Sequence, residues 1–147
     1  MSRLSAQFIV TGTGDTLNKG IVSVNDEGII TDLIDTGGNL TETASLEFYN
    51  GIIVPGFVNT HCHLELSHLK GIFPPKTGLP EFLENIWLHR NNNEQSILEA
   101  AKKADREMWN NGISAVGDIS NNQLTFPLKS SSTVYYHTFI EALGFSP

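Results

Sequence analysis

The hydrophobic positions of the chain follow two different patterns, which divide it near residue 55. In the first part, short segments rich in β-branched residues alternate with clusters of glycine and polar residues, which is typical of strands joined by turns. The segments that predict strands are Gln7–Thr11, Gly20–Val24 and Ile29–Asp35. Their connections are too short to hold crossover helices, so we expect these strands to form an antiparallel sheet.

The second part contains longer hydrophobic segments. A continuous apolar run is broken by Pro55-Gly56, and its continuation Phe57–His61 predicts a strand buried on both faces. Further buried strands are predicted at Ile113–Ser120 and in a segment that ends near Glu141. Helical segments separate the first two strands, and this order is typical of right-handed parallel strand–helix units. We therefore expect two regions, residues 1–54 and 55–147.

Two helices are predicted between the first two strands of the second region. The segment 79–90 places Pro80 in its first turn and forms an apolar face on which Trp87 is expected to be a core residue. The segment 94–110 is followed by a stop signal, Asn111-Gly112. The predicted apolar stripes consist of Phe82, Leu83, Ile86 and Trp87 in the first helix and of Ile97, Ala101, Ala104 and Met108 in the second.

Composition narrows the range of partners and compartments. The formal net charge is −7, and the nine basic residues are scattered, which argues against a nucleic acid or an anionic membrane as a partner. The single cysteine, Cys62, fits a reducing compartment. The N-terminus turns polar too early for a signal peptide, and every apolar run is shorter than the ~18 residues of a membrane span. We expect a cytoplasmic protein.

Two histidines, His61 and His63, lie at the end of the strand that follows Pro55-Gly56. Because side chains alternate along a strand, we expect both histidines to share one face with Phe57 and Asn59. The carboxyl ends of parallel strands carry the active sites of α/β proteins, and neutral imidazole is a good ligand for Zn²⁺. A His-x-His pair by itself is more often a pair of ordinary histidines than a metal site. Whether this pair binds a metal therefore has to be judged from the surrounding sequence.

The segment around this pair, residues 54–71, reads VPGFVNTHCHLELSHLKG. It resembles the first barrel strand of the amidohydrolase superfamily, in the branch of cytosine deaminases, chlorohydrolases and S-adenosylhomocysteine deaminases. Two later segments, GISAVGDIS and YYHTFIEALGF, are similar to the second and third barrel strands. By this resemblance, His61 and His63 are two ligands of a catalytic divalent metal, Zn²⁺ in the first place and Fe²⁺ as the alternative. Asn59 stands where many members carry Asp and others carry Asn.

The resemblance implies an α/β fold: the N-terminal part of a metal-dependent hydrolase (β/α)8 TIM barrel, about three βα units, preceded by part of a small β-sandwich domain. The family draws its remaining metal ligands and its proton shuttle from later strands. We therefore expect the 147 residues alone to be inactive and poorly stable, because an open three-strand sheet leaves unpaired edges. For the full-length protein, we expect a small-molecule substrate and a homodimer.

Other polar residues near the predicted site are weaker candidates. Glu65 and His68 lie on the segment after the histidine pair, and each is either a substrate contact or an ordinary loop residue. Asp118 and Glu141 end the second and third strands, where we expect the active face. Glu141 is the better candidate for substrate binding, because an acid among apolar neighbours is costly to bury without a partner. Cys62 alternates away from the histidines and is interpreted as a packing residue.

The favoured function is hydrolysis of a C–N bond, most of all deamination of a nucleobase-like or related heterocyclic amine by metal-activated water. This choice of substrate rests on the resemblance alone. A chlorohydrolase or amide hydrolase of the same superfamily is the alternative within this class. A non-catalytic metal-binding fragment and an antiparallel binding module without metal are the alternatives outside it.

Overall fold

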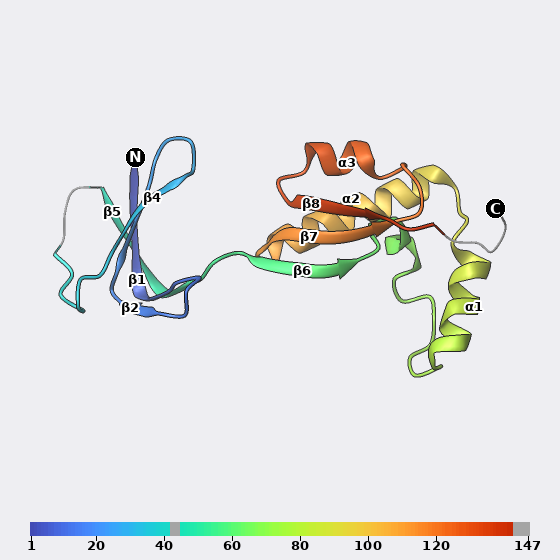
Figure 1. Cartoon of the computed structure of the whole chain (residues 1–147), viewed down its shortest axis with the longest axis horizontal. Helices are drawn as coiled ribbons and strands as arrows, with labels where there is room; N and C mark the ends of the chain where they lie inside the picture. The colour runs from blue at the N-terminus through green and yellow to red at the C-terminus, as the bar shows by residue number, and fades with distance from the viewer. Residues whose placement is uncertain (42–44, 143–147) are drawn as a thin grey trace. The chain divides into compact units, whose positions relative to one another are not determined.

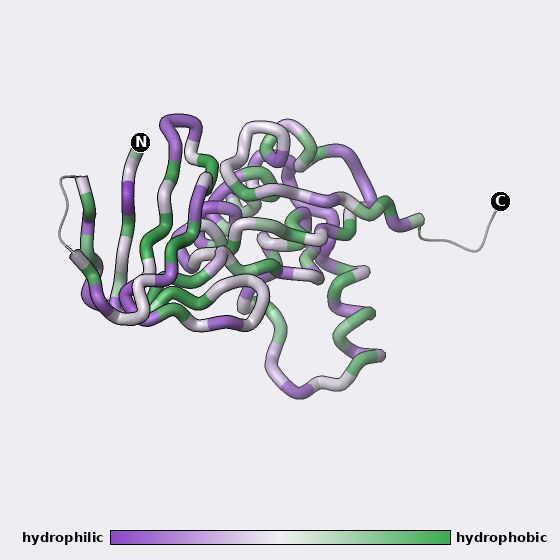
Figure 2. Tube along the Cα trace, turned by 60° about the vertical axis from the view of Figure 1, so that its left-hand side comes forward, coloured by the Kyte–Doolittle hydropathy of each residue, from purple (hydrophilic) through white to green (hydrophobic). Residues whose placement is uncertain are grey.

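The computed structural model describes residues 1–41 and 45–142. It divides the chain into two compact units, Met1–Pro55 and Gly56–Pro147. Figure 1 labels most of their strands and helices, and Figure 2 shows that hydrophobic stretches recur along the strands. Each unit is described by itself.

Unit 1 is a five-stranded sheet in which the first strand has three partners. Strand β1 pairs antiparallel with β2 and β3 and parallel with β5, while β4 pairs antiparallel with β3. The antiparallel pairing of the three predicted strands is therefore confirmed, and β2 and β5 were not predicted. The strands are β1 Ser2–Val10, β2 Thr16–Asn18, β3 Ile21–Val24, β4 Ile30–Ile34 and β5 Leu46–Ile53.

The core of unit 1 is small. Ala6 and Ile9 of β1 and Ile21 and Val22 of β3 are buried, whereas most of β4 and β5 is exposed. The hairpin between β3 and β4 is closed by Asn25, whose Oδ1 accepts the backbone N–H groups of residues 27 and 29. This side chain replaces a backbone acceptor in the turn, which is why asparagine is favoured there.

Unit 2 contains a parallel three-stranded sheet in the order β6-β7-β8, so the predicted parallel arrangement is confirmed. A 3₁₀ helix and two α helices lie between β6 and β7, and a further short helix, which was not predicted, lies between β7 and β8. The elements are β6 Phe57–Cys62, η1 Leu64–Leu69, α1 Leu79–His89, α2 Glu94–Asn110, β7 Ile113–Ser120, α3 Phe126–Ser131 and β8 Tyr135–Ile140.

The two faces of this sheet differ in burial. Val116, Asp118 and Ser120 of β7 point to the side covered by α2 and α3 and are 0–1% exposed. The opposite side is open: Val58 is 62% and Phe139 is 52% exposed. The prediction of a strand buried on both faces is therefore wrong for β6, because the described residues supply helices for one face only.

The two longer helices differ in the same way. In α2, Ile97 and Ala101 of the predicted stripe are buried, and Asp105 is buried beside them because it accepts hydrogen bonds from Ser132 and Tyr136, each at 2.7 Å. Burial, together with the bond to this carboxylate, raises the pKa of the Tyr136 phenol. In α1, by contrast, every residue is at least partly exposed, and the expectation that Trp87 is a core residue is wrong: it is 67% exposed.

Among the described residues, none of the helices is both long enough and apolar enough to span a membrane.

The start of α2 gives a test of the fold. Asn93 Oδ1 accepts the N–H groups of Gln95 at 2.9 Å and Ser96 at 3.4 Å, two of the donors that a helix start leaves without partners. We expect Asn93→Ala to lower the free energy of unfolding by about 1 kcal/mol. Urea titration measures this as a lower midpoint with an unchanged slope. Asn91→Ala, an exposed position in the same loop, serves as the control, and equal midpoints for both variants would contradict the capping role.

Candidate metal centre and substrate cavity

The backbone of β6 contains a bulge just before the histidine pair. Asn59 pairs with Val116 and Cys62 with Asp118, so three steps along β6 match two steps along β7. An extra residue of this kind reverses the side-chain alternation that follows it. Asn59 consequently reaches Met108 of α2, and the prediction that it shares a face with His61 is wrong.

His61 and His63 lie close together beyond this bulge. Their ring centroids are 5.2 Å apart with the planes at 65°. Nδ1 of His63 is buried and has no hydrogen-bond partner among the described residues. A buried imidazole nitrogen without a partner is costly, so it fits a position that a ligand completes. The described residues hold no group of three or more His, Cys, Asp or Glu side chains placed to bind a metal, and metal binding by this pair stays a prediction.

The two histidines line a cavity of about 670 Å³ at the carboxyl end of the sheet. Glu141, directly after β8, lines the same cavity, as do Arg90 and Asn121. The structure therefore brings Glu141 together with the predicted metal pair. The apolar part of the wall comes from η1, the loop after it and α1: Leu66, Leu69, Phe73, Phe82, Leu83 and Ile86. The predicted apolar face of α1 thus borders a cavity.

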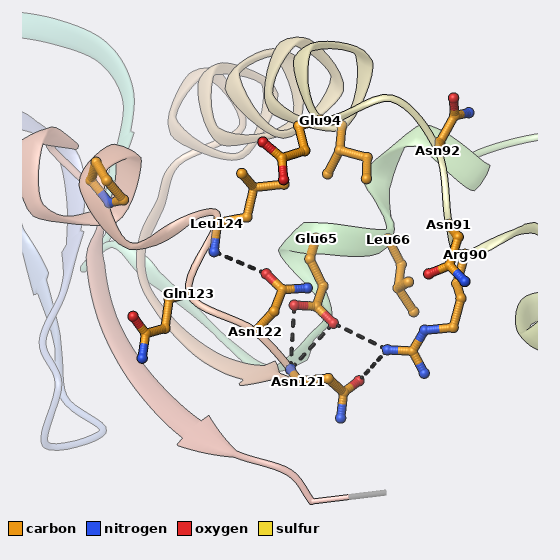
Figure 3. Close-up of a pocket in the computed structure, with 12 residues that line it drawn as sticks. Glu65, Leu66, Arg90, Asn91, Asn92, Glu94, Asn121, Asn122, Gln123 and Leu124 are labelled. Atoms are coloured by element: carbon orange, nitrogen blue, oxygen red, sulfur yellow. Dashed lines mark hydrogen bonds and ion pairs between the residues drawn. The ribbon is translucent and has the colours of Figure 1, made fainter.

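A chain of polar contacts connects Glu65 to the wall of this cavity, which Arg90, Asn121 and Glu141 line. Glu65 accepts the backbone N–H of Asn121 at 3.2 Å, and its carboxylate lies 3.6 Å from the guanidinium of Arg90. Arg90 donates to the side-chain oxygen of Asn121 at 2.9 Å, and the Asn121 amide donates to the Glu141 carboxylate at 3.0 Å. Figure 3 shows Glu65 between Arg90 and Asn121, next to a second, amide-rich cavity of about 740 Å³.

Glu65 lies in η1 rather than in an open loop, and it is 3% exposed. Its side chain borders the second cavity and is absent from the lining of the first, where the histidines lie. The carboxylate bridges η1 to the end of β7 and to Arg90. The structure does not place Glu65 on the wall of the cavity that holds the histidines, and substrate contact by Glu65 stays a prediction.

His68 also lies in η1 and is half-buried. Its Nδ1 is 3.1 Å from the backbone oxygen of Glu65, and its Nε2 is buried without a partner among the described residues. His68 is not part of the cavity wall that holds His61 and His63. The structure does not bring this candidate to the metal pair.

Cys62 and Asp118 lie beside each other. Burial, and then the neighbouring Asp118 carboxylate, raises the pKa of the Cys62 thiol to about 12, so the thiol stays protonated near neutral pH. Asp118 points toward α3, where it pairs with Lys129, and it contacts the backbone of Leu64. The expectation that Asp118 faces the active side is wrong. The alternation along β7 turns Asp118 to the helix-covered side, together with Val116 and Ser120.

Arg90 and Asn121 were not identified from the sequence. Asn121 directly follows β7, and the rule that placed Glu141 at a strand end applies equally to it. Arg90 is the residue that caps α1, and its route to the cavity depends on the fold of the loop between α1 and α2. The signal for Asn121 was therefore present in the sequence, and the signal for Arg90 was not.

Residues 52–144, more than half of the chain, match the Amidohydrolase family. The chain belongs to the amidohydrolase family.

Its relatives with curated names are deaminases. It is 31% identical to adenosine deaminase of Helicobacter pylori over 103 residues, and this alignment covers 67% of this chain and 24% of that protein. It is 29% identical over 119 residues to 5-methylthioadenosine/S-adenosylhomocysteine deaminase of Symbiobacterium thermophilum, over 80% of this chain and 25% of that protein.

Two solved structures share the fold of this chain. Aminofutalosine deaminase of Helicobacter pylori, in complex with methylthio-coformycin, aligns with a TM-score of 0.78 and 22% identity over 100% of this chain and 36% of that chain. Atrazine chlorohydrolase of Arthrobacter aurescens TC1, complexed with zinc, aligns with a TM-score of 0.70 and 16% identity over 95% of this chain and 35% of that chain. The chain therefore spans about a third of each of these proteins.

The polar chain at Glu65 gives a test that needs no substrate. Because its side chain is 2% exposed and holds both Arg90 and the Asn121 N–H, we expect Glu65→Ala to lower the free energy of unfolding by about 2 kcal/mol. The control is Glu107→Ala, which removes the solvent-exposed pair with Lys70 and should change stability far less than Glu65→Ala does. Chemical unfolding of both variants without ligand measures the difference. Equal stability of wild type and Glu65→Ala would contradict a structural role for the contacts of Glu65.

Proposed function

We propose that this chain supplies the first metal-ligand pair and part of the substrate cavity of a metal-dependent hydrolase that deaminates a nucleobase-like or related heterocyclic amine. The observation that carries the proposal is the placement of His61 and His63 on one cavity together with Glu141. The deaminase names of the relatives support the reaction class. They do not select a particular ring.

The proposed architecture follows from the same family. The parallel strands β6, β7 and β8 correspond to the first three strands of a (β/α)8 barrel, whose interior is the face that α2 and α3 leave open. Unit 1 corresponds to part of a β-sandwich domain. The exposed apolar side chains of its sheet, Ile30, Phe48 and Ile52 among them, support this assignment, because a sandwich buries such a face against a second sheet.

The metal centre is assigned to His61 and His63. Zn²⁺ is favoured because imidazole is one of its usual ligands and because the chlorohydrolase structure with this fold is a zinc complex, with Fe²⁺ as the alternative. The chemistry that such a metal supplies is activation of a water molecule for attack at neutral pH. The bulge in β6 turns both imidazoles to the cavity side, and the unpartnered Nδ1 of His63 is the atom whose environment a ligand would complete.

The remaining cavity residues are assigned to substrate binding. The Glu141 carboxylate is an acceptor suited to the N–H groups of an amine-bearing heterocycle, and Asn121 holds it by a 3.0 Å hydrogen bond. Arg90 adds a fixed positive charge on the same wall. Phe73 and Phe82 provide apolar surface for a flat ring. The proposed substrate is accordingly a small molecule.

The full-length protein is proposed to act as a homodimer in the cytoplasm.

The metal assignment predicts the composition of the purified protein. We expect full-length wild-type protein to retain a divalent metal through dialysis and a His61→Ala/His63→Ala variant to lose most of it, because two imidazole ligands are removed. Elemental analysis of both proteins measures the difference. A His89→Ala variant, at an exposed histidine that is absent from the cavity lining, is the matched control. Equal metal content in the double variant and the wild type would contradict the assignment.

The reaction predicts release of ammonia. We expect the metal-loaded full-length protein to release ammonia from at least one member of a panel of purines, pyrimidines, their nucleosides and heterocyclic amines, and the histidine double variant to release none. A coupled ammonia assay measures both. Release of chloride from chlorinated heterocycles, with no ammonia from the panel, would favour the chlorohydrolase alternative. Bound metal without turnover of amines, amides or chlorinated rings would favour a non-catalytic role.

A further inference from the structure

A buried ion pair lies directly behind the histidine pair, on the helix-covered side of the sheet. Asp118 of β7 is 0% exposed, and Lys129 of α3 contacts it with its ammonium group. The ammonium also donates to Ser120 at 2.9 Å and to Thr138 at 3.3 Å, so its three donors all have partners. Ser120 in turn donates to Asp118 at 3.3 Å.

One oxygen of Asp118 lies outside this network. Lys129 and Ser120 contact Oδ2, whereas Oδ1 accepts the backbone N–H of Leu64 at 2.7 Å. Leu64 directly follows His63 and is the first residue of η1. The N–H groups at a helix start need partners from outside the helix, and η1 begins without a side-chain cap from His63. Asp118 therefore provides from a neighbouring strand the acceptor that this helix start lacks.

The position of this bond matters for the histidines. The pairing of β6 with β7 is irregular between Asn59 and Cys62 and ends at Cys62, so the backbone at His63 lies beyond the regular strand pairing. The hydrogen bond from Leu64 to Asp118 is the next tie between the two segments along the chain. It constrains the direction in which the backbone leaves His63.

We propose that Asp118, held by Lys129, is a positioning residue that sets the geometry of His61 and His63 for metal binding. It acts through the Leu64 N–H and touches neither the metal nor the substrate. The partners of this fully buried carboxylate hold it in one orientation, which a solvated side chain would not keep. The inference rests on the proposed metal site, and it adds a residue whose role is to keep that site in shape.

The test compares zinc affinity with stability in the full-length protein. Asp118→Ala removes the acceptor of Leu64, and we expect it to weaken Zn²⁺ binding about 10–100-fold, the usual cost of losing support behind a metal ligand. Asp105→Ala is the matched control, because Asp105 is also buried and hydrogen-bonded but holds Ser132 and Tyr136 instead of the histidine segment. We expect it to lower stability by a comparable amount and to leave zinc affinity unchanged. Chelator competition measures affinity, and urea unfolding measures stability.

A rescue variant separates positioning from general stability. Asp118→Asn/Lys129→Met removes the ion pair but keeps an amide oxygen that can accept the Leu64 N–H, so we expect zinc affinity within about threefold of wild type. The visible spectrum of Co²⁺-loaded protein should be altered in Asp118→Ala and preserved in this double variant. If Asp118→Ala does not fold, loss of affinity in Asp118→Leu/Lys129→Met, which replaces the pair without an acceptor, is the supporting result.

The outcomes distinguish this inference from the proposed function. If wild type and the His61→Ala/His63→Ala variant bind zinc equally, the histidines do not form the metal site. This result contradicts both the proposed function and the positioning role of Asp118. If wild type binds zinc through the histidines and the variants without an acceptor bind it as tightly, Asp118 is a structural residue only. Equal loss of affinity in Asp118→Ala and Asp105→Ala would also overturn the proposal, because it would trace the effect to stability.

Discussion

The site depends on a single extra residue in β6. In a regular strand, residues two apart point the same way, and Asn59 would then face the cavity together with the histidines. The bulge between Asn59 and Cys62 breaks this rule once, so that Asn59 contacts α2 while His61 and His63 reach the cavity. One bulge thus allows β6 to pack under the helix and still direct His61, and His63 just after the strand, to the cavity.

The polar interior of unit 2 is divided between two sides of this strand end. On the helix side, buried carboxylates have partners within the protein: Asp118 pairs with Lys129, and Asp105 accepts hydrogen bonds from two hydroxyl groups. On the cavity side, Arg90, Asn121 and Glu141 are linked to one another but remain part of the cavity wall. Buried groups with every partner satisfied favour a fixed scaffold, whereas groups that line a cavity keep capacity for a ligand.

The sequence predicts the elements with strong periodicity and the residues that end strands. The parallel strands, α2 and the closeness of Glu141 to the histidines follow from hydrophobic pattern and strand polarity. The side on which Asn59 lies does not follow, because one bulge in β6 reverses the alternation and leaves no local trace in the sequence. The side of Asp118 does not follow either, because a one-residue difference in the register of β7 turns its side chain to the opposite face. The burial of Glu65 was missed because its partners, Arg90 and Asn121, are far away along the chain.

The chain of contacts from Glu65 through Arg90 and Asn121 to Glu141 has a consequence for evolution and engineering. These four residues come from four different segments, yet each holds the next. Substitutions in such a network are not additive, since a change at one member alters what its neighbours can do. Altered specificity at Glu141 is therefore expected to need compensating changes at Asn121 or Arg90, and homologues that differ at one of these positions should tend to differ at the others.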